Sequence, residues 1–133
     1  MSNKEDVMLK LSFDYAIQII QLSKEINKKG DYSLANQILR SGTSIGANIR
    51  ESKHAESRAD FIHKLKIASK EAFENEYWLQ LCNQLQIIEC KQLLNELNLI
   101  MRILSKAIAT AKKNHLFEQS QNQARKELIT TKK

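Results

Sequence analysis

The chain has 133 residues, contains no proline and only 3 glycines, and is 42% hydrophobic but only 6% aromatic. A chain of this length can bury a core without disulfides or metals, and the scarcity of turn-forming residues argues against folds rich in strands and loops. Its 21 Lys and Arg against 15 Asp and Glu give a formal net charge of +6, which favours an anionic partner without identifying it. We expect one all-α domain with long helices and short connections.

The apolar content of the chain and its two cysteines indicate the cellular compartment of the protein. Residues 1–6 are polar and predicted to be flexible, and no segment has the apolar length of a signal peptide or a membrane span. Cys82 and Cys90 match neither a zinc nor a redox spacing, so we interpret them as packing residues of a reducing compartment. We therefore expect a soluble cytoplasmic protein without membrane contact.

The first predicted helix runs from about Val7 to Asn27 and carries two apolar stripes. One stripe contains Leu9, Phe13, Ile17 and Ile20, and the other contains Met8, Leu11, Tyr15, Ile19, Leu22 and Ile26. A helix in a monomeric bundle needs one stripe toward the core, so the second predicts a partner subunit or unusually deep burial. Lys28, Lys29 and Gly30 suit the end of this helix.

The second predicted helix runs from about Ser33 to Glu56, with Asp31 or Ser33 as its cap. Its polar residues at helical spacing are Ser41, Ser44, Asn48 and Glu51, which share one face and form a predicted structural motif. Within it, a hydrogen-bonded Asn48 at the contact with another helix is predicted to fix the register of the bundle. Gly42 and Gly46 lie between them and predict close approach of a neighbouring helix. The alternative is a break in the helix near Gly42.

The third predicted helix begins with a capping-box-like pair, Ser57 and Asp60, and runs to about Leu85. It also carries two stripes, the second containing Ile62, Phe73, Tyr77 and Leu81. Its acidic residues Glu71, Glu74 and Glu76 are mostly solvated in our interpretation, although one could face the polar motif of the second helix.

After a connection near residues 86–89, a fourth helix has the strongest apolar periodicity and is predicted to end near Lys112 and Lys113. The bundle domain would therefore span residues 7–113. Residues 114–133 are polar and predicted to form a tail that is mobile, or helical only on contact with a partner.

We find no glycine-rich phosphate loop, nucleophile motif or Cys/His metal module, so the sequence predicts no enzymatic activity, no cofactor and no metal site. The pattern Glu51-x-x-His54 followed by Asp60-x-x-His63 resembles the ligand spacing of di-iron bundles and is kept as a minor alternative. These pairs flank a predicted turn, at a solvent-accessible end instead of the middle of a bundle.

The same turn is rich in basic residues, and six of them form the predicted nucleic-acid-binding set: Arg50, Lys53, Arg58, Lys64, Lys66 and Lys70. Such a cluster could hold a phosphate backbone without reading sequence. The alternative is a solvated helix face that happens to be basic.

The segment Gln37-Ile38-Leu39-Arg40-Ser41, followed by Ser44-Ile45, Asn48-Ile49 and Glu51, resembles the signature of a bacterial four-helix bundle family. That family is associated with intervening sequences in large-subunit ribosomal RNA genes, and the accessory variability determinants of diversity-generating retroelements look similar. The resemblance covers roughly residues 9–111. Gly46, Arg50 and Ser52 depart from the Pro, Ala and Gly of many members.

The resemblance implies an up-down-up-down bundle that assembles into a ring-like homopentamer. It also implies, for members related to the retroelement proteins, a basic surface that associates with nucleic acid and with a reverse transcriptase. Our leading hypothesis is a non-enzymatic homo-oligomer that binds RNA or DNA through the basic cluster. The alternative is a protein-interaction adaptor whose partner docks on an exposed apolar stripe or on the tail.

Overall fold

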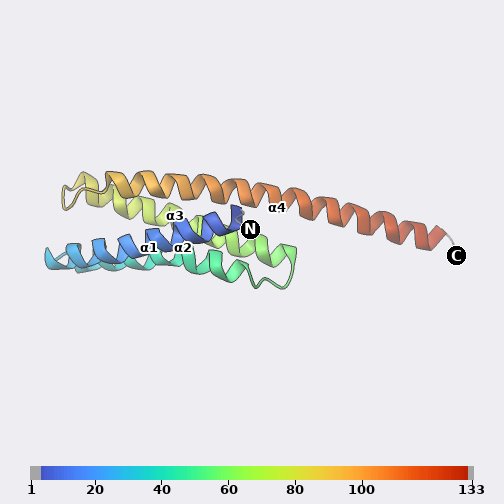
Figure 1. Ribbon diagram of the computed structural model, residues 1–133, viewed down its shortest axis with the longest axis horizontal. Helices are drawn as coiled ribbons and strands as arrows, with labels where there is room; N and C mark the ends of the chain where they lie inside the picture. Colours follow the sequence, from blue (N-terminus) through green and yellow to red (C-terminus); the bar gives the residue numbers. More distant parts are fainter. Residues whose placement is uncertain (1–3, 132–133) are drawn as a thin grey trace.

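The computed structural model describes residues 4–131, with side chains described from Val7 onward. It contains four helices: α1 (Lys4–Lys28), α2 (Tyr32–Ser52), α3 (Arg58–Gln84) and α4 (Lys91–Thr131). Successive helices run in opposite directions, which confirms the predicted up-down-up-down bundle (Figure 1). The contact between α1 and α4 is the sparsest of the four helix pairs that pack together, and α1 and α3 lie diagonally across the core.

The helix ends follow local chemistry, with two corrections. Gly30 has a φ of +90° and ends α1 as predicted, whereas Gln86 adopts a left-handed φ of 57° after α3 without being glycine. The predicted end of α2 at Glu56 is wrong, because the helix ends at Ser52. Asp31 occupies the N-cap position of α2, but its side chain makes no capping hydrogen bond.

The fourth helix is longer than the sequence predicted. We expected it to end near Lys112, but α4 continues without interruption to Thr131 and projects beyond the bundle (Figure 1). This segment has no Gly or Pro and contains good helix formers such as Gln, Lys, Glu and Leu, so nothing in it terminates a helix. The predicted tail is therefore helical over residues 114–131, while residues 132–133 lie outside the described residues.

The prediction of a flexible segment at residues 1–6 lies in part outside the described residues. The described chain is already helical at Lys4, three residues before the predicted start of the first helix. Only the backbone of residues 4–6 is described, so Val7 is the first residue of α1 whose side-chain packing is described.

The core is formed by one stripe from each helix, as the periodicity predicted. Its fully buried large side chains include Tyr15, Ile19, Ile26, Ile38, Ile45, Ile49, Leu65, Leu79, Leu97 and Leu104. Cys82 and Cys90 are also buried, and burial raises the pKa of both thiols, that of Cys90 to about 12. Both cysteines are therefore protonated packing residues near neutral pH.

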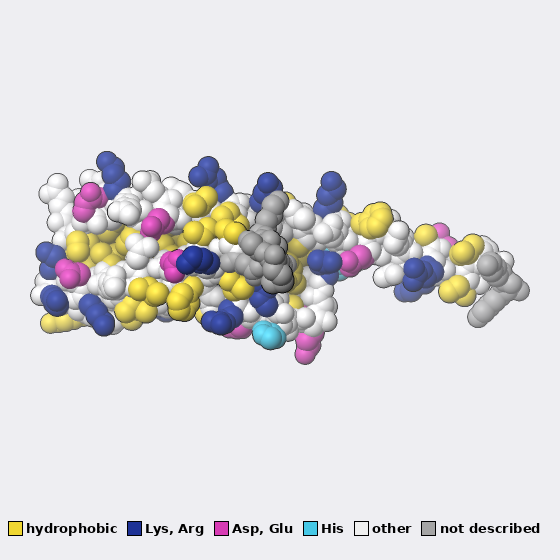
Figure 2. Space-filling view, viewed as in Figure 1, with side chains coloured by type: hydrophobic (Ala, Val, Ile, Leu, Met, Phe, Trp, Pro, Cys, Tyr) yellow, Lys and Arg dark blue, Asp and Glu magenta, His cyan; other side chains and the backbone are white. Residues whose placement is uncertain are grey.

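Much of the second stripe on α1 and on α3 is exposed in the single chain, although Ile62 of α3 is buried. On α1, Phe13, Ile17 and Ile20 are 58%, 43% and 39% exposed, and on α3, Phe73 and Tyr77 are 62% and 55% exposed. Figure 2 shows hydrophobic side chains gathered along the α1 side of the molecule. Of the two outcomes that the sequence left open, deep burial of this stripe is therefore wrong for the isolated chain.

The glycines of α2 allow α1 to approach closely. A Cβ on Gly42 would lie 2.7 Å from Cγ2 of Ile19, and one on Gly46 would lie 3.3 Å from the carbonyl oxygen of Ser12. The helix is continuous through both residues, so the alternative of a break near Gly42 is wrong. Gly42 and Gly46 thus form a seam where the α1 and α2 backbones come together.

A buried polar network crosses the core beside this seam. The amide nitrogen of Asn75 donates to the carbonyl oxygen of Ile38 (3.1 Å) and to Oγ of Ser41 (3.0 Å), while its amide oxygen accepts from the hydroxyl of Tyr15. Asn75, Ser41 and Tyr15 are at most 1% exposed. This network joins α1, α2 and α3, because an unpaired buried amide would cost roughly 1 to 3 kcal/mol.

Adding a methyl group at the seam should destabilise the bundle. Gly42→Ala gains roughly 1 kcal/mol of helix propensity but forces a Cβ into branched, buried Ile19, and overpacking costs about 1 to 3 kcal/mol. We expect a net loss of about 1 kcal/mol in urea unfolding, and in the background of Ile19→Ala, where the branched side chain is absent, the same Gly42→Ala change should no longer destabilise the bundle. Gly46→Ala is the matched control and should be close to neutral; a Gly42→Ala protein as stable as wild type would disprove the packing account.

Removing the Tyr15 hydroxyl should lower stability and change its pH dependence. Tyr15→Phe leaves the Asn75 amide oxygen without that donor, at a cost of roughly 1 to 3 kcal/mol. Burial raises the pKa of Tyr15, so the native state holds the neutral phenol while the unfolded chain ionises above about pH 10. The neutral phenol therefore contributes its full share to the free energy of unfolding below pH 10. Above pH 10 this stabilisation falls, by up to about 1.4 kcal/mol per pH unit.

The measurement compares the free energy of unfolding from pH 8 to 12 in wild type and Tyr15→Phe, where the difference between the two should shrink above about pH 10. Tyr32→Phe is the matched control, since its ring is 66% exposed. A constant difference across the whole range would contradict the buried neutral phenol.

Candidate nucleic-acid interface

The turn between α2 and α3 is held by a reciprocal cap. Oγ of Ser57 accepts from the backbone N–H of Asp60 at 3.0 Å, and the Asp60 carboxylate accepts from the backbone N–H of Glu56 at 3.2 Å. The predicted capping-box-like start of the third helix is therefore confirmed. The cap fixes the first turn of α3, where Arg58 begins the basic surface.

Arg50, Lys53, Arg58 and Lys64 lie within about two helical turns of the α2–α3 turn, whereas Lys66 and Lys70 lie further along α3, Lys70 near its middle. Arg50, Lys66 and Lys70 are exposed, Lys64 is beside α2, and Lys53 and Arg58 line a cavity between the helices. The structure therefore does not gather the six predicted binding residues into a single flat patch.

Lys64 and Arg58 are joined to carboxylates. Nζ of Lys64 donates to Glu51 at 3.0 Å, and this hydrogen bond raises the pKa of Lys64. Nη2 of Arg58 donates to Glu118 on α4 at 2.9 Å. These partly exposed ion pairs contribute little stability, but they partly neutralise the charge of the two cations.

The outer face of α3 carries a line of exposed side chains that the sequence reasoning did not recognise as one surface. The line is formed by His63, Lys66, Lys70, Phe73 and Tyr77, all exposed. Their separations of three and four residues place them on one face, and this spacing was the signal that could have revealed the line. Cations followed by exposed aromatic rings are a combination that suits both phosphates and unpaired bases.

The predicted polar motif divides between two environments. Ser41 is buried and bonded to Asn75, but Ser44 and Asn48 are half-buried, and each bonds a carbonyl oxygen one turn back in its own helix. Glu51 is exposed and holds Lys64. The buried amide that joins the helices is therefore Asn75 of α3, whereas Asn48 lies on the flank of α2.

An ion-pair cluster also connects the middle of α2 to α3. Arg40 contacts the carboxylates of Glu71 and Glu74, which raise the pKa of the guanidinium. Two of the three glutamates that we interpreted as mostly solvated are thus paired across the α2–α3 flank. Sequence reasoning missed this contact because Arg40 and its partners are far apart in the chain.

The carboxylate and histidine pairs of the minor metal alternative are not brought together. Glu51 pairs with Lys64, Asp60 caps α3, and His54 and His63 are exposed. Within residues 4–131 no group of three or more His, Cys, Asp or Glu side chains could hold a metal ion. The arrangement of the described residues thus offers no support for the di-iron alternative.

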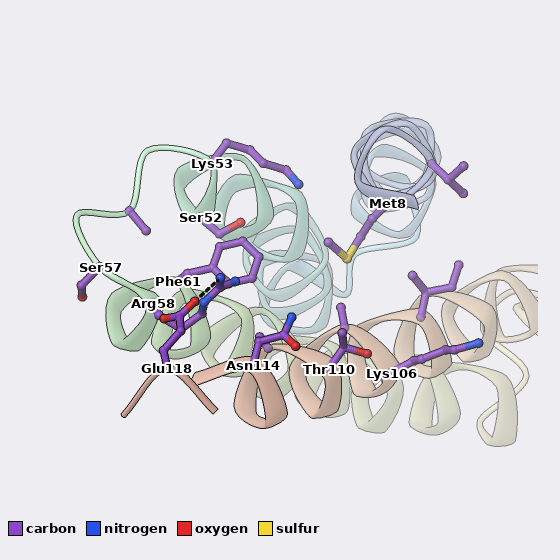
Figure 3. Close-up of a pocket in the computed structure, with 15 residues that line it drawn as sticks. Met8, Ser52, Lys53, Ser57, Arg58, Phe61, Lys106, Thr110, Asn114 and Glu118 are labelled. Carbon is purple, nitrogen blue, oxygen red and sulfur yellow. Dashed lines mark hydrogen bonds and ion pairs between the residues drawn. The ribbon is translucent and has the colours of Figure 1, made fainter. Parts of the chain in front are cut away.

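A cavity of about 790 Å³ opens beside the basic cluster (Figure 3). Met8 of α1, Ser52 and Lys53 at the end of α2, Phe61 of α3, and Thr110 and Asn114 of α4 line it. Figure 3 shows the Arg58–Glu118 ion pair closing one side, with Met8 and Phe61 approaching from different helices. The cavity lies where α4 leaves the bundle, so the start of its projecting segment forms part of the wall.

The fold and this end of the molecule define an antiparallel four-helix bundle with a basic turn. None of the described helices is long and apolar enough to cross a membrane. A family model described as "23S rRNA-intervening sequence protein" matches residues 4–109. The chain therefore belongs to this family, as its sequence signature indicated.

A solved structure supports the same assignment. It is a protein of unknown function from the S23 ribosomal protein family of Bacteroides thetaiotaomicron, with 44% sequence identity and a TM-score of 0.77. The match covers 80% of this chain and 99% of that chain. No curated protein matches the sequence. Neither description names a catalytic activity, and the part of α4 beyond residue 109 lies outside the family match.

Proposed function

We propose that the protein is a non-enzymatic, cytoplasmic bundle that binds RNA or DNA through its basic end and acts as a ring-like homo-oligomer. The observation that carries this proposal is a set of cations that extends from the capped turn along α3: Lys53, Arg58 and Lys64 near the turn, with Arg50, Lys66 and Lys70 exposed. Two helices supply these cations, so the region could follow the phosphate backbone of a single-stranded or a double-stranded nucleic acid.

The two exposed apolar faces support self-association. Phe13, Ile17 and Ile20 lie on the outer side of α1, and Phe73 and Tyr77 lie on the outer side of α3, the diagonal helix. Two different patches on opposite sides favour head-to-tail contact, which closes into a ring when the rotation permits. The family resemblance suggests five copies, and a ring would repeat the basic end around its axis.

The family resemblance also suggests a reverse transcriptase as a protein partner, through the accessory proteins of diversity-generating retroelements.

A second candidate function is a protein-interaction adaptor without nucleic-acid binding. Its supporting observation is the projecting part of α4, where Leu116, Phe117, Leu128 and Ile129 are 57% to 66% exposed. Apolar side chains so exposed on an isolated helix suit a protein partner.

Charge reversal tests the nucleic-acid interface. Lys66→Glu with Lys70→Glu should weaken binding at least about tenfold at low salt and reduce the slope of log affinity against log salt by about 2, since each lost phosphate contact contributes roughly 0.9. Lys112→Glu with Lys113→Glu, exposed on α4, makes the same charge change and should have the smaller effect. Gel shift or fluorescence anisotropy over a salt series provides the measurement.

Absence of salt-sensitive association between the wild-type protein and any single- or double-stranded nucleic acid, at micromolar protein, would contradict the proposal. That result would leave the adaptor function as the better description of this bundle.

Light scattering tests the ring. The wild-type protein should have a mass several times the 15.4 kDa of one chain, and Ile17→Glu should shift it toward the single chain by placing a charge in the apolar face of α1. Asn98→Glu, at an exposed polar position of α4 outside both apolar faces, is the matched control. A wild-type mass near 15.4 kDa over a wide concentration range would rule out self-association.

A further inference from the structure

The cavity beside the basic turn has the size and walls of a small-molecule site. Its volume of about 790 Å³ falls within the roughly 300 to 1,000 Å³ of ligand pockets. Met8, Phe61, Ile103 and Ala107 provide apolar walls, and the Phe61 ring is only half-buried. A flat apolar or aromatic group could therefore enter beside an aromatic ring.

Further along α4 the wall of the cavity also carries polar side chains. Thr110 and Asn114 line the cavity, and in Figure 3 the Asn114 amide points inward. A hydroxyl and an amide each offer a donor and an acceptor, which an alkyl chain cannot use. A nucleobase edge carries donors and acceptors and can pair with an Asn amide.

The rim of the cavity is cationic and continuous with the proposed binding surface. Arg58 and Lys53 belong both to the cavity lining and to the basic cluster. The Arg58 guanidinium reaches Glu118 through Nη2, and a guanidinium has five N–H donors, so it can bind a phosphate while keeping this ion pair. The phosphate next to a buried base would thus lie beside a cation.

We propose that this cavity binds an unpaired nucleobase of a single strand, with the adjoining phosphate on Arg58. The inference rests on the proposed function and adds to it a preference for unpaired nucleotides. The polar wall comes from Thr110, Asn114 and Glu118, which lie beyond the residues matched by the family model, so the site is a feature of this chain's extended α4.

The first experiment uses the wild-type protein and fluorescence anisotropy with three probes of equal length: a mixed-sequence DNA single strand, the same strand with every base removed, and the duplex. The complete single strand should bind at least about fivefold more tightly than the abasic strand, because a stacked base contributes to affinity. Equal affinities of these two strands would overturn the inference while leaving the proposed function intact. If none of the three probes bound, the proposed function itself would fail.

The second experiment locates the base. Ala107→Phe fills the cavity without changing any charge, and Ala109→Phe places the same ring on the exposed side of α4 as the matched control. The first variant should lose the preference for the complete strand and the second should keep it. Asn114→Leu, at an exposed position that tolerates substitution, should reduce the preference even if Ala107→Phe does not fold. Preference retained in both cavity variants would overturn the inference.

A third experiment tests whether the cavity binds an apolar acid instead of a nucleobase. Decanoate, an alkyl carboxylate, should neither displace the single strand nor raise the melting temperature of the wild-type protein. Stabilisation by decanoate that Ala107→Phe abolishes, together with no preference for bases, would assign the cavity to apolar acids and overturn the proposal.

Discussion

The buried amide of Asn75 is the constraint on which the arrangement of α1, α2 and α3 depends. It bonds the hydroxyl of Tyr15, the carbonyl oxygen of Ile38 and the hydroxyl of Ser41, so a shift of any of the three helices would leave a polar group unpaired in the core. Gly42 contributes to the same contact between the helices. A Cβ there would lie 3.1 Å from the Asn75 amide nitrogen, so a glycine at this position leaves room for the amide to reach α2.

The fourth helix contributes none of the three partners of Asn75 and packs mainly through apolar contacts with α3. Its contact with α1 is sparse, and the cavity opens on this side of the bundle, beside the point where α4 projects. The Arg58–Glu118 ion pair is the described polar link between α4 and the capped start of α3.

The surfaces proposed for function are separate in space. Cations gather at the α2–α3 turn, while the apolar faces lie on the outer sides of α1 and α3. Lys66 and Lys70 are an exception, since they share the outer face of α3 with Phe73 and Tyr77. In a head-to-tail ring this face would place cations next to the subunit boundary, where neighbouring copies could contact one strand together.

The sequence by itself determined the helices, their core stripes and the close contact at Gly42, because these features follow from periodicity and side-chain size within one segment. It also indicated the basic turn and its cap. It misplaced the inter-helix amide on Asn48, since a polar residue on a helix flank and one in the core share the same spacing pattern. It ended α4 too early, because charge at Lys112 and Lys113 favours a helix end without forcing one.

Only the tertiary structure decided which polar groups meet. Arg40 with Glu71 and Glu74, Arg58 with Glu118, and the partners of Asn75 are far apart in the chain, and their pairing depends on the rotation of each helix about its axis. The cavity likewise requires four elements to leave space between them. Local sequence patterns set the outward and inward faces of each helix, but the position of one helix against the next is a property of the packed core as a whole.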